Sequence, residues 1–518
     1  MLKRALRAFI AFFFGHGIAI VGSLLLVPLY LHVWSAALYG EWLALYSLVA
    51  YLSSLDLGVQ TYAVNRLTQV YARGNLEEYR QVQDTAFAFY TCLALLGGVG
   101  IVAFAWWAPI RSWFHVSLTS ERAAFVIVVM LGEQFLWTMP ASMLWSVYTT
   151  IGDLARTQWV TNVNRVLSLG LSIAALLLWP NLVVVAGAQV VGFLLVFGWV
   201  WWDVRKRYPD LTPGFTYARA RMLRPILNQS IFFALIDLAV GATLQGSNFI
   251  VASLAGTEAL ALFVTTRTLA NSIRQLVALF VQSCSTNLTQ LEALEDRRRL
   301  RLAFRLVVFA TVAGCLAVSA SLWFEGGSVF SVWTRGQLVP DVWLLRTFLL
   351  WLVLQSPWIA SSAIQMYTNK HRGLAVSYLV SSFGGLLLGL AIIPRFGLKG
   401  LPMAFILAEA VACYHFVVRN ACRIIGESYL KFAGKLWGGM IVVSVSGLAA
   451  TWAVHLMRLG PFTSWICSGV ASVVAVSIST WVFWFHDEER ALLRRKVGSG
   501  AKLVGRSLPL SLRVTNSG

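Results

Sequence analysis

The sequence predicts an all-α polytopic membrane protein: about 14 transmembrane helices, in two six-helix lobes related by an internal repeat, plus two extra C-terminal helices. Apolar segments recur along the chain, each near the ~20 residues that cross a ~30 Å hydrocarbon core. Hydrophobic residues make up 58% of the 518 residues and charged residues 12%, against roughly 45–50% and 25% in soluble proteins. Lys and Arg also fall in alternate loops between these segments. Together these observations leave no room for a folded soluble module.

The predicted spans follow one another with short connections. They cover residues 9–31, 38–62, 84–108, 123–146, 159–179, 182–202, 226–253, 258–283, 303–324, 343–366, 375–394, 400–420, 436–457 and 463–485. Tryptophans stand at several span ends, for example Trp106, Trp179 and Trp323. Such aromatic belts are typical of the boundary between lipid and water.

The positive charge predicts the orientation of the spans. With the N-terminus in the cytoplasm, 31 Lys and Arg fall in cytoplasmic segments, 7 in outer loops and 3 inside spans. Cytoplasmic loops of membrane proteins carry this excess, so both termini are predicted to be cytoplasmic. The net charge of +19 therefore favours anionic lipid headgroups, not nucleic acid, as the neighbours of these residues.

A faint repeat divides the chain into an N-terminal lobe (1–202), a basic cytoplasmic linker (203–225) and a C-terminal lobe (226–421). Two additional spans (422–485) and a cytoplasmic tail (486–518) follow. The triplet 67–69, Leu-Thr-Gln, recurs at 288–290. Gly98, Trp107 and Phe114 recur at one fixed offset as Gly314, Trp323 and Phe330. Duplicated halves with a substrate site between them are a recurrent transporter plan.

Signatures of enzymes and metal sites are missing from the sequence. The six cysteines are scattered without paired spacing and are interpreted as packing residues, not as a metal site or a disulfide framework. No Walker A loop is present, and the predicted outer loops are too short for a catalytic domain. We therefore predict a protein that is not an enzyme and needs no cofactor or metal.

Three polar residues share one face of the eighth predicted span. Arg267, Asn271 and Arg274 recur close to whole helical turns. A charged group at mid-span costs roughly 2.5–3.5 kcal/mol on insertion scales and usually faces a protein interior or a wet cavity. The two guanidinium groups are able to bind phosphate oxygens bidentately. The alternative is a structural pair, neutralised by acids or reaching an interface, and the spacing does not choose between the two.

Three carboxylates are candidates for ion coupling, and each has a structural alternative. Asp237 shares a face of the seventh span with Ser230, Gly241 and Asn248. It is predicted either to pair with Arg267 or to bind a proton or sodium ion. Asp56 stands just before Gly58, where it alternatively stabilises a break in the helix, and Glu133 is a coupling site or a protonated structural carboxyl. In the fifth span, Arg165 contacts the substrate or snorkels to the inner surface.

Two stretches resemble a known family. The first runs from Tyr39-Gly40 through Asp56-Leu57-Gly58 and Asn65-Arg66 to Arg73-Gly74-Asn75, and the second covers Asn369-Lys370 and residues 394–404, PRFGLKGLPMA. They resemble the polysaccharide (oligosaccharide) flippases of the O-antigen type, within the multidrug/oligosaccharidyl-lipid/polysaccharide exporter superfamily. The resemblance in topology and length covers nearly the whole chain.

The resemblance implies a flippase of the bacterial inner membrane. Such proteins move an undecaprenyl-pyrophosphate-linked oligosaccharide from the inner to the outer leaflet for cell-surface polysaccharide biosynthesis, alongside polysaccharide polymerase machinery. In this chain Arg267 and Arg274 would meet the pyrophosphate, and Arg66 would assist entry of the headgroup. The rivals are a cation-coupled multidrug exporter of the same superfamily and a membrane polymerase or glycosyltransferase.

Overall fold

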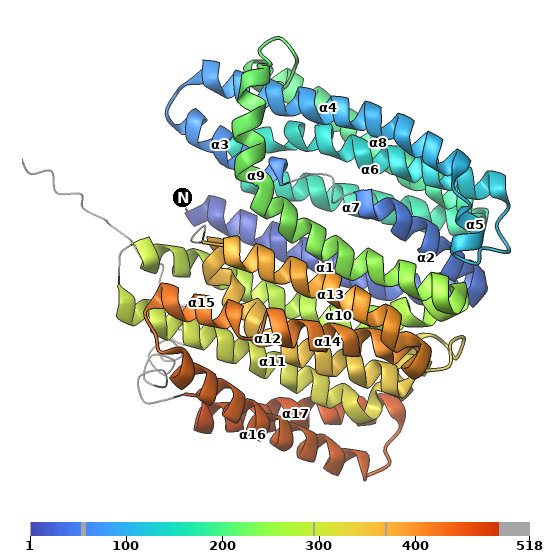
Figure 1. Cartoon of the computed structure of the whole chain (residues 1–518), viewed down its shortest axis with the longest axis vertical. Coiled ribbons are helices and arrows are strands. Elements are labelled where there is room, and N and C mark those ends of the chain that lie inside the picture. Colours follow the sequence, from blue (N-terminus) through green and yellow to red (C-terminus); the bar gives the residue numbers. More distant parts are fainter. Residues whose placement is uncertain (1, 53–57, 294–295, 368–369, 486–489, 491–518) are drawn as a thin grey trace, which may run out of the picture.

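A computed structural model describes residues 2–52, 58–293, 296–367, 370–485 and 490. Asp56 lies outside these residues, as does nearly all of the predicted tail. Every regular element in the described part is a helix (Figure 1). The helices are α1 Leu2–Val33, α2 Ala36–Ala50, α3 Val59–Ala72, α4 Leu76–Trp107, α5 Ile110–Trp113, α6 Glu121–Thr150, α7 Leu154–Leu178, α8 Leu182–Arg207, η2 Pro209–Leu211, α9 Ala220–Gly241, η3 Ala242–Gly246, α10 Ser247–Ala293, α11 Arg297–Trp333, α12 Val342–Tyr367, α13 Arg372–Phe396, η4 Gly397–Lys399, α14 Gly400–Ala412, α15 Phe416–Ile425, α16 Tyr429–His455 and α17 Pro461–Phe483.

Ten helical segments in the described part are long and apolar enough to cross a membrane, and the protein is accordingly a multi-pass membrane protein. Two of the ten are much longer than one crossing needs. They run over Ser230–Gln275 and Arg372–Ala412, and each contains a glycine with positive φ, Gly256 at 84° and Gly397 at 67°. Two shorter apolar helices, Gly17–Val33 and Ala36–Ala50, accompany them. The number of spans predicted from the sequence, 14, stays a prediction.

Several helix boundaries differ from the predicted span boundaries. The predicted span 38–62 consists of α2 and α3, and Gly58 at the start of α3 has φ 66°. The predicted span 400–420 is divided into α14 and α15. The predicted linker 203–225 is shorter, because α8 continues to Arg207 and α9 begins at Ala220. A positive φ is open to glycine without steric cost, and hydropathy does not report it.

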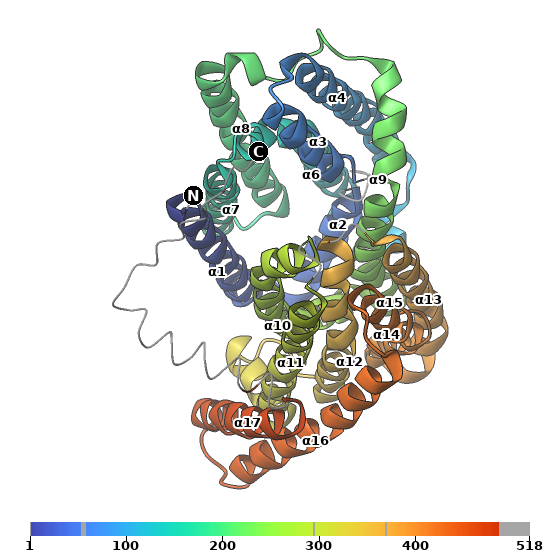
Figure 2. The same ribbon diagram turned by 90° about the vertical axis from the view of Figure 1, so that its left-hand side faces the viewer.

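The helices form two groups that lie side by side in Figure 2. Helices α3, α4, α6, α7 and α8 belong to the first group, and α10 to α17 to the second. Helix α9 lies between them, packed against α3 and α13. At this contact Phe233 packs on His371, with ring centroids 4.4 Å apart. Burial lowers the pKa of His371, which favours its neutral form at pH 7.

The two groups are joined tightly at the end of the molecule far from the N-terminus. An apolar core there connects α1, α2 and α6 with α10 and α12. A Cβ built on Gly40 would lie 1.8 Å from the carbonyl oxygen of Thr257, so α2 and α10 touch through their backbones. The indole N–H of Trp333 donates to the carbonyl of Leu24 at 2.7 Å. We call this region the closed end.

A buried carboxylate organises the closed end. Glu41 on α2 has no exposed surface. It accepts hydrogen bonds from the backbone N–H groups of Ser117, Leu118 and Thr119 at 2.7, 2.7 and 2.8 Å, and from the hydroxyl of Thr119 at 2.5 Å. These donors compensate the loss of hydration that burial of a charge entails. Glu41 therefore fixes the loop that leads into α6.

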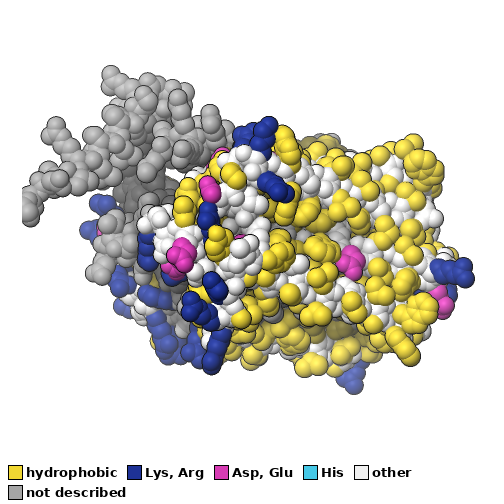
Figure 3. Space-filling model, turned by 90° about the horizontal axis from the view of Figure 1, so that it is seen from above, with side chains coloured by type: hydrophobic (Ala, Val, Ile, Leu, Met, Phe, Trp, Pro, Cys, Tyr) yellow, Lys and Arg dark blue, Asp and Glu magenta, His cyan; other side chains and the backbone are white. Residues whose placement is uncertain are grey.

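Lys and Arg gather toward one end of the molecule in Figure 3, while apolar side chains cover much of the remaining surface in view. This pattern is that of a membrane protein whose charged end projects from the lipid.

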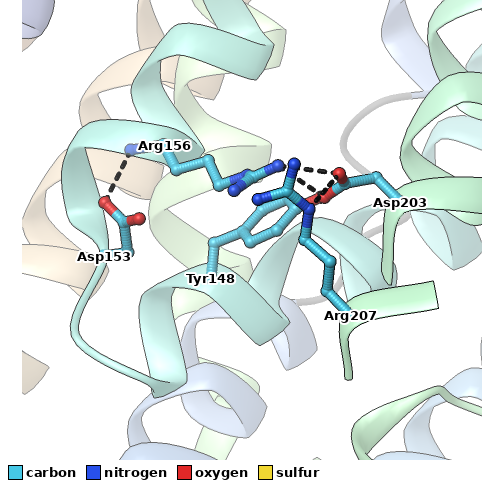
Figure 4. A network of polar contacts seen from close by, with 5 residues as sticks. All are labelled: Tyr148, Asp153, Arg156, Asp203 and Arg207. Carbon is cyan, nitrogen blue, oxygen red and sulfur yellow. Dashed lines mark hydrogen bonds and ion pairs between the residues drawn. The ribbon is translucent and has the colours of Figure 1, made fainter. Parts of the chain in front are cut away.

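A polar network ties α6, α7 and α8 together (Figure 4). Asp203, only 3% exposed, lies at its centre. Its carboxylate accepts from Arg156 Nη2 at 2.7 and 2.8 Å, from Arg207 Nε at 2.9 Å and from the Tyr148 hydroxyl at 2.6 Å. The Arg156 guanidinium also lies over the Tyr148 ring, 4.9 Å from its centroid. Two cations and one hydroxyl thus depend on a single buried carboxylate.

We expect Asp203→Asn to destabilise the folded protein by about 3 kcal/mol, since breaking a buried ion pair leaves uncompensated charge. The measurement is thermal unfolding in detergent. The control is Asp210→Asn, whose carboxylate is 76% exposed and pairs with Arg80, because exposed pairs contribute about 0–1 kcal/mol. Equal shifts for the two variants would contradict the expectation.

Candidate functional site

A small pocket lies between η3, α10 and α12. Its polar lining residues are Thr243, Arg267, Asn271, Arg274, Trp351 and Gln355. No acidic side chain is found among the described residues that line this pocket. The space measures about 380 Å³, including its open side. We call it the arginine pocket.

Arg267 is held by the protein. Its side chain is 9% exposed, and it donates from Nη1 to the carbonyl of Leu244 at 3.0 Å and from Nη2 to Asn248 Oδ1 at 2.9 Å. Asn248 in turn donates to the Ser47 hydroxyl on α2 at 2.5 Å. Arg267 therefore links α10, η3 and, through Asn248, α2. The hydrogen bonds of Arg267 thus go to Leu244 and Asn248, and not to Asp237.

Arg274 differs from Arg267. It lies half-buried in the same pocket, two helical turns further along α10. Among the described residues, no side chain or carbonyl forms a hydrogen bond or an ion pair with its guanidinium. Five N–H donors therefore remain for a ligand or for water. Of the two pocket arginines, Arg274 is the one whose guanidinium is able to bind a ligand without losing hydrogen bonds to described residues.

The π-helical turn η3 lies within the predicted polar face of the seventh span. The sequence places Asp237, Gly241 and Asn248 on one side, as in a regular α-helix. The five residues of η3 form a π-helix, whose i→i+5 hydrogen bonds accommodate an extra residue. Gln245 lines one space with Asp237 and Gly241, whereas Asn248 accepts a hydrogen bond from Arg267. The Leu244 carbonyl of η3 also accepts from Arg267.

A second, larger cavity lies between α3, α6 and α9. Its polar lining residues are Gln60, Thr138, Ser142, Trp145, Asp237 and Gln245, and its space measures about 980 Å³. Asp237 is exposed in this cavity, which we call the polar chamber. None of its described lining residues is cationic. Leu244 lines both the polar chamber and the arginine pocket, so the two spaces are neighbours.

The other predicted site residues lie outside both spaces. Arg66 on α3 forms an ion pair with Glu78, and Arg165 on α7 donates to the carbonyl of Gly15 at 2.6 Å. Glu133 packs at the contact between α6 and α4, where its carboxylate would be 2.4 Å from a Cβ on Gly98. The structure thus brings Arg267, Asn271 and Arg274 together, with Asp237 in the adjacent chamber.

The sequence analysis did not select Glu409, a buried carboxylate next to the arginine pocket. Glu409 on α14 is 3% exposed and accepts hydrogen bonds from the indole N–H groups of Trp351 and Trp358, at 2.9 and 3.0 Å. Trp351 also lines the arginine pocket. The signal was present, since Glu409 is an acid inside an apolar segment, the same criterion that selected Glu133.

Solved structures of known proteins share this fold. The lipid II flippase MurJ in an inward closed conformation has a TM-score of 0.70 at 12% identity, covering 95% of this chain and all of that chain. An inward-facing multidrug resistance MATE family transporter of the MOP superfamily has a TM-score of 0.61 at 14% identity, covering 79% of this chain and 96% of that chain. This protein shares the fold of these two solved proteins.

A third MOP-fold structure comes from Pyrococcus furiosus. It is described as a MOP superfamily transporter whose binding pocket has reversed polarity, and this reversed polarity suggests a different function for that protein. It has a TM-score of 0.60 at 14% identity, covering 82% of this chain and 97% of that chain. No family model and no curated protein matches the sequence. All three structural neighbours are transporters or flippases, not enzymes.

Proposed function

We propose that this protein is a flippase for undecaprenyl-pyrophosphate-linked oligosaccharides, working by alternating access for cell-surface polysaccharide biosynthesis. The observation that carries the proposal is the arginine pocket. Two guanidinium groups line it, no described lining residue is acidic, and Arg274 has no protein partner among the described residues. Coulomb repulsion in a medium of low dielectric constant disfavours a cation at this place and favours an anion.

The two neighbouring spaces suit the two chemical parts of such a cargo. The pyrophosphate would bind Arg274 and Asn271, with Arg267 contributing charge while it keeps its contacts with Leu244 and Asn248. The polar chamber would take the sugars, since amides, hydroxyls and a tryptophan line it. A sugar presents hydroxyls to such groups and apolar ring faces to aromatic side chains. Because Leu244 lines both spaces, one molecule is able to reach both.

The same proposal includes 14 spans in two lobes, with both termini in the cytoplasm of a bacterial cell. The glycine breaks at Gly256 and Gly397 would each divide a long segment into two crossings. The closed end would then face outward, and the protein would stand in an inward-facing state. Asp56, Asp237 and Glu133 remain the proposed coupling residues for a proton or sodium ion, and Arg66 and Arg165 the proposed accessory cargo contacts.

A cation-coupled multidrug exporter is the second candidate, and the exposed Asp237 in the polar chamber is the observation that favours it. The MATE neighbours have the same fold, and the fold does not decide the cargo. The two candidates predict opposite charges on the transported molecule.

The test uses purified protein in proteoliposomes with a fluorescent undecaprenyl-pyrophosphate-linked disaccharide. Flipping is measured as the fraction of probe that becomes accessible to an impermeant quencher. We expect Arg274→Gln to slow flipping at least about tenfold, because a hydrogen bond to a charged group contributes about 1.5–3 kcal/mol. The control is Arg122→Gln, the same loss of charge at an exposed site at the start of α6.

Three outcomes of this experiment are distinguished. Slow flipping in Arg274→Gln and normal flipping in Arg122→Gln support the flippase. Flipping of the probe at the wild-type rate by Arg274→Gln overturns the proposed site. If the reconstituted protein transports ethidium, a fluorescent cation, but does not flip the lipid probe, the result supports the exporter instead.

A further inference from the structure

Glu409 stands directly behind the arginine pocket. Its two carboxylate oxygens are bound by Trp351 and Trp358, which lie two helical turns apart on α12. Trp351 forms part of the pocket wall and stacks on Phe405, with ring centroids 4.9 Å apart and planes within 10°. The tryptophan ring therefore separates Glu409 from the space that contains Arg274.

Glu409 lacks a direct cationic partner. Among the described residues, no Lys, Arg or His forms an ion pair with it, and both donors that it accepts from are neutral indoles. Arg274 lines the pocket whose wall Trp351 forms, so its charge acts on Glu409 across that wall. The other titratable groups facing it are Tyr378 on α13 and, after α14, Cys413 and Tyr414. These three are neutral near pH 7 by their ordinary chemistry.

The charge of Glu409 therefore depends on what occupies the pocket. Burial favours the neutral form of a carboxyl group, whereas a nearby positive charge and hydrogen-bond donors favour the ionised form. While the pocket is empty, the uncompensated Arg274 charge opposes protonation of Glu409, whereas burial favours it. An anion bound to Arg274 would cancel the effect of this charge and place a second negative charge near the carboxylate. Only the two indole donors would then oppose protonation.

We propose that Glu409 is a proton-binding counter-charge of the arginine pocket, which binds a proton more readily when an anion occupies Arg274 than when the pocket is empty. The proton comes from water and binds one carboxylate oxygen, so binding of one anion is accompanied by uptake of up to one proton. This inference rests on the proposed function, because it requires an anion at Arg274. It assigns proton linkage to a residue other than Asp56, Asp237 or Glu133.

The linkage has a defined sign. Binding that takes up one proton weakens as pH rises, by up to about tenfold per pH unit. Glu409→Gln resembles the protonated side chain, so we expect this variant to bind the anion at least as tightly as the wild type does, with no pH dependence arising from residue 409. Glu409→Asp keeps the titrating group, and we expect it to keep the pH dependence.

The experiment is calorimetric titration of the full-length protein in detergent with farnesyl pyrophosphate, in two buffers of different ionisation enthalpy. The two buffers together give the number of protons taken up per ligand. Pyrophosphate itself titrates near neutral pH. The quantity of interest is therefore the difference in protons taken up per ligand between wild type and Glu409→Gln. We expect this difference to be about one proton at the pH where it is largest.

The possible results separate this inference from the proposed function. A difference of about one proton between wild type and Glu409→Gln, retained in Glu409→Asp, supports the counter-charge. Tight binding with equal proton uptake in wild type and Glu409→Gln overturns it and leaves the pyrophosphate site intact. Binding that is unaffected by Arg274→Gln, or absent from the wild type, overturns both. Thermal unfolding checks that each variant is folded.

Discussion

Gly40→Val is expected to prevent formation of the closed end. Any Cβ at residue 40 would lie 1.8 Å from the carbonyl oxygen of Thr257 and 2.4 Å from its carbonyl carbon. Both are backbone atoms, so no side-chain rotation relieves the overlap, and α2 and α10 must separate. Overpacking of this kind costs more than about 3 kcal/mol where the surroundings are rigid, enough to shift a two-state equilibrium about a hundredfold.

Amide hydrogen exchange measures this separation directly. We expect faster exchange in α2 and in the residues after Gly256, together with earlier thermal unfolding. Gly100→Val is the matched control, since no atom lies within 4 Å of a Cβ at that position on α4. Unchanged exchange in α2 of Gly40→Val would show that the close approach of α2 and α10 is absent in solution.

Glu41→Leu is expected to have the second-largest effect. The substitution removes the acceptors of three backbone N–H groups and one hydroxyl in residues 117–119. A buried donor left without a partner costs about 1–3 kcal/mol. Among the three residues only Thr119 is buried, so water is able to replace the other two acceptors. We therefore expect the free energy of unfolding to fall by about 3 kcal/mol. The loop into α6 should become accessible to limited proteolysis while the rest of the protein stays intact.

Glu121→Leu provides the comparison for Glu41→Leu. Glu121 is an exposed acid in the first turn of α6, at the same end of the molecule, and interacts mainly with the helix dipole. Its loss should therefore lower stability by less than about 1 kcal/mol. If the two variants unfold at the same temperature, the hydrogen bonds of Glu41 contribute nothing measurable.

Much of the fold is predictable from the sequence. Hydropathy reports which segments prefer lipid, and it predicted an all-helical membrane protein. The structure contains the long apolar helices that this prediction requires. Hydropathy does not report backbone geometry within an apolar run. The breaks at Gly58, Gly256 and Gly397 each depend on a positive φ, which a glycine permits but does not require.

The candidate site was predictable in part. Arg267, Asn271 and Arg274 lie on one helix, so their spacing alone placed them on one face, and the structure brings all three to one pocket. Spacing could not distinguish the two arginines. The difference arises because the Leu244 carbonyl of η3 and the Asn248 side chain at the start of α10 both accept hydrogen bonds from Arg267, and no described residue does so for Arg274.

The sequence alone determined the class of this protein, its helical character and the presence of buried cations in an apolar setting, because those properties follow from composition and helical periodicity. Only the tertiary structure decided which polar groups meet. Glu41 with the loop before α6, Asp203 with Arg156, and Glu409 with two tryptophans all join residues more than 45 positions apart. A contact between distant helices depends on how those helices pack, and local spacing carries no record of that packing.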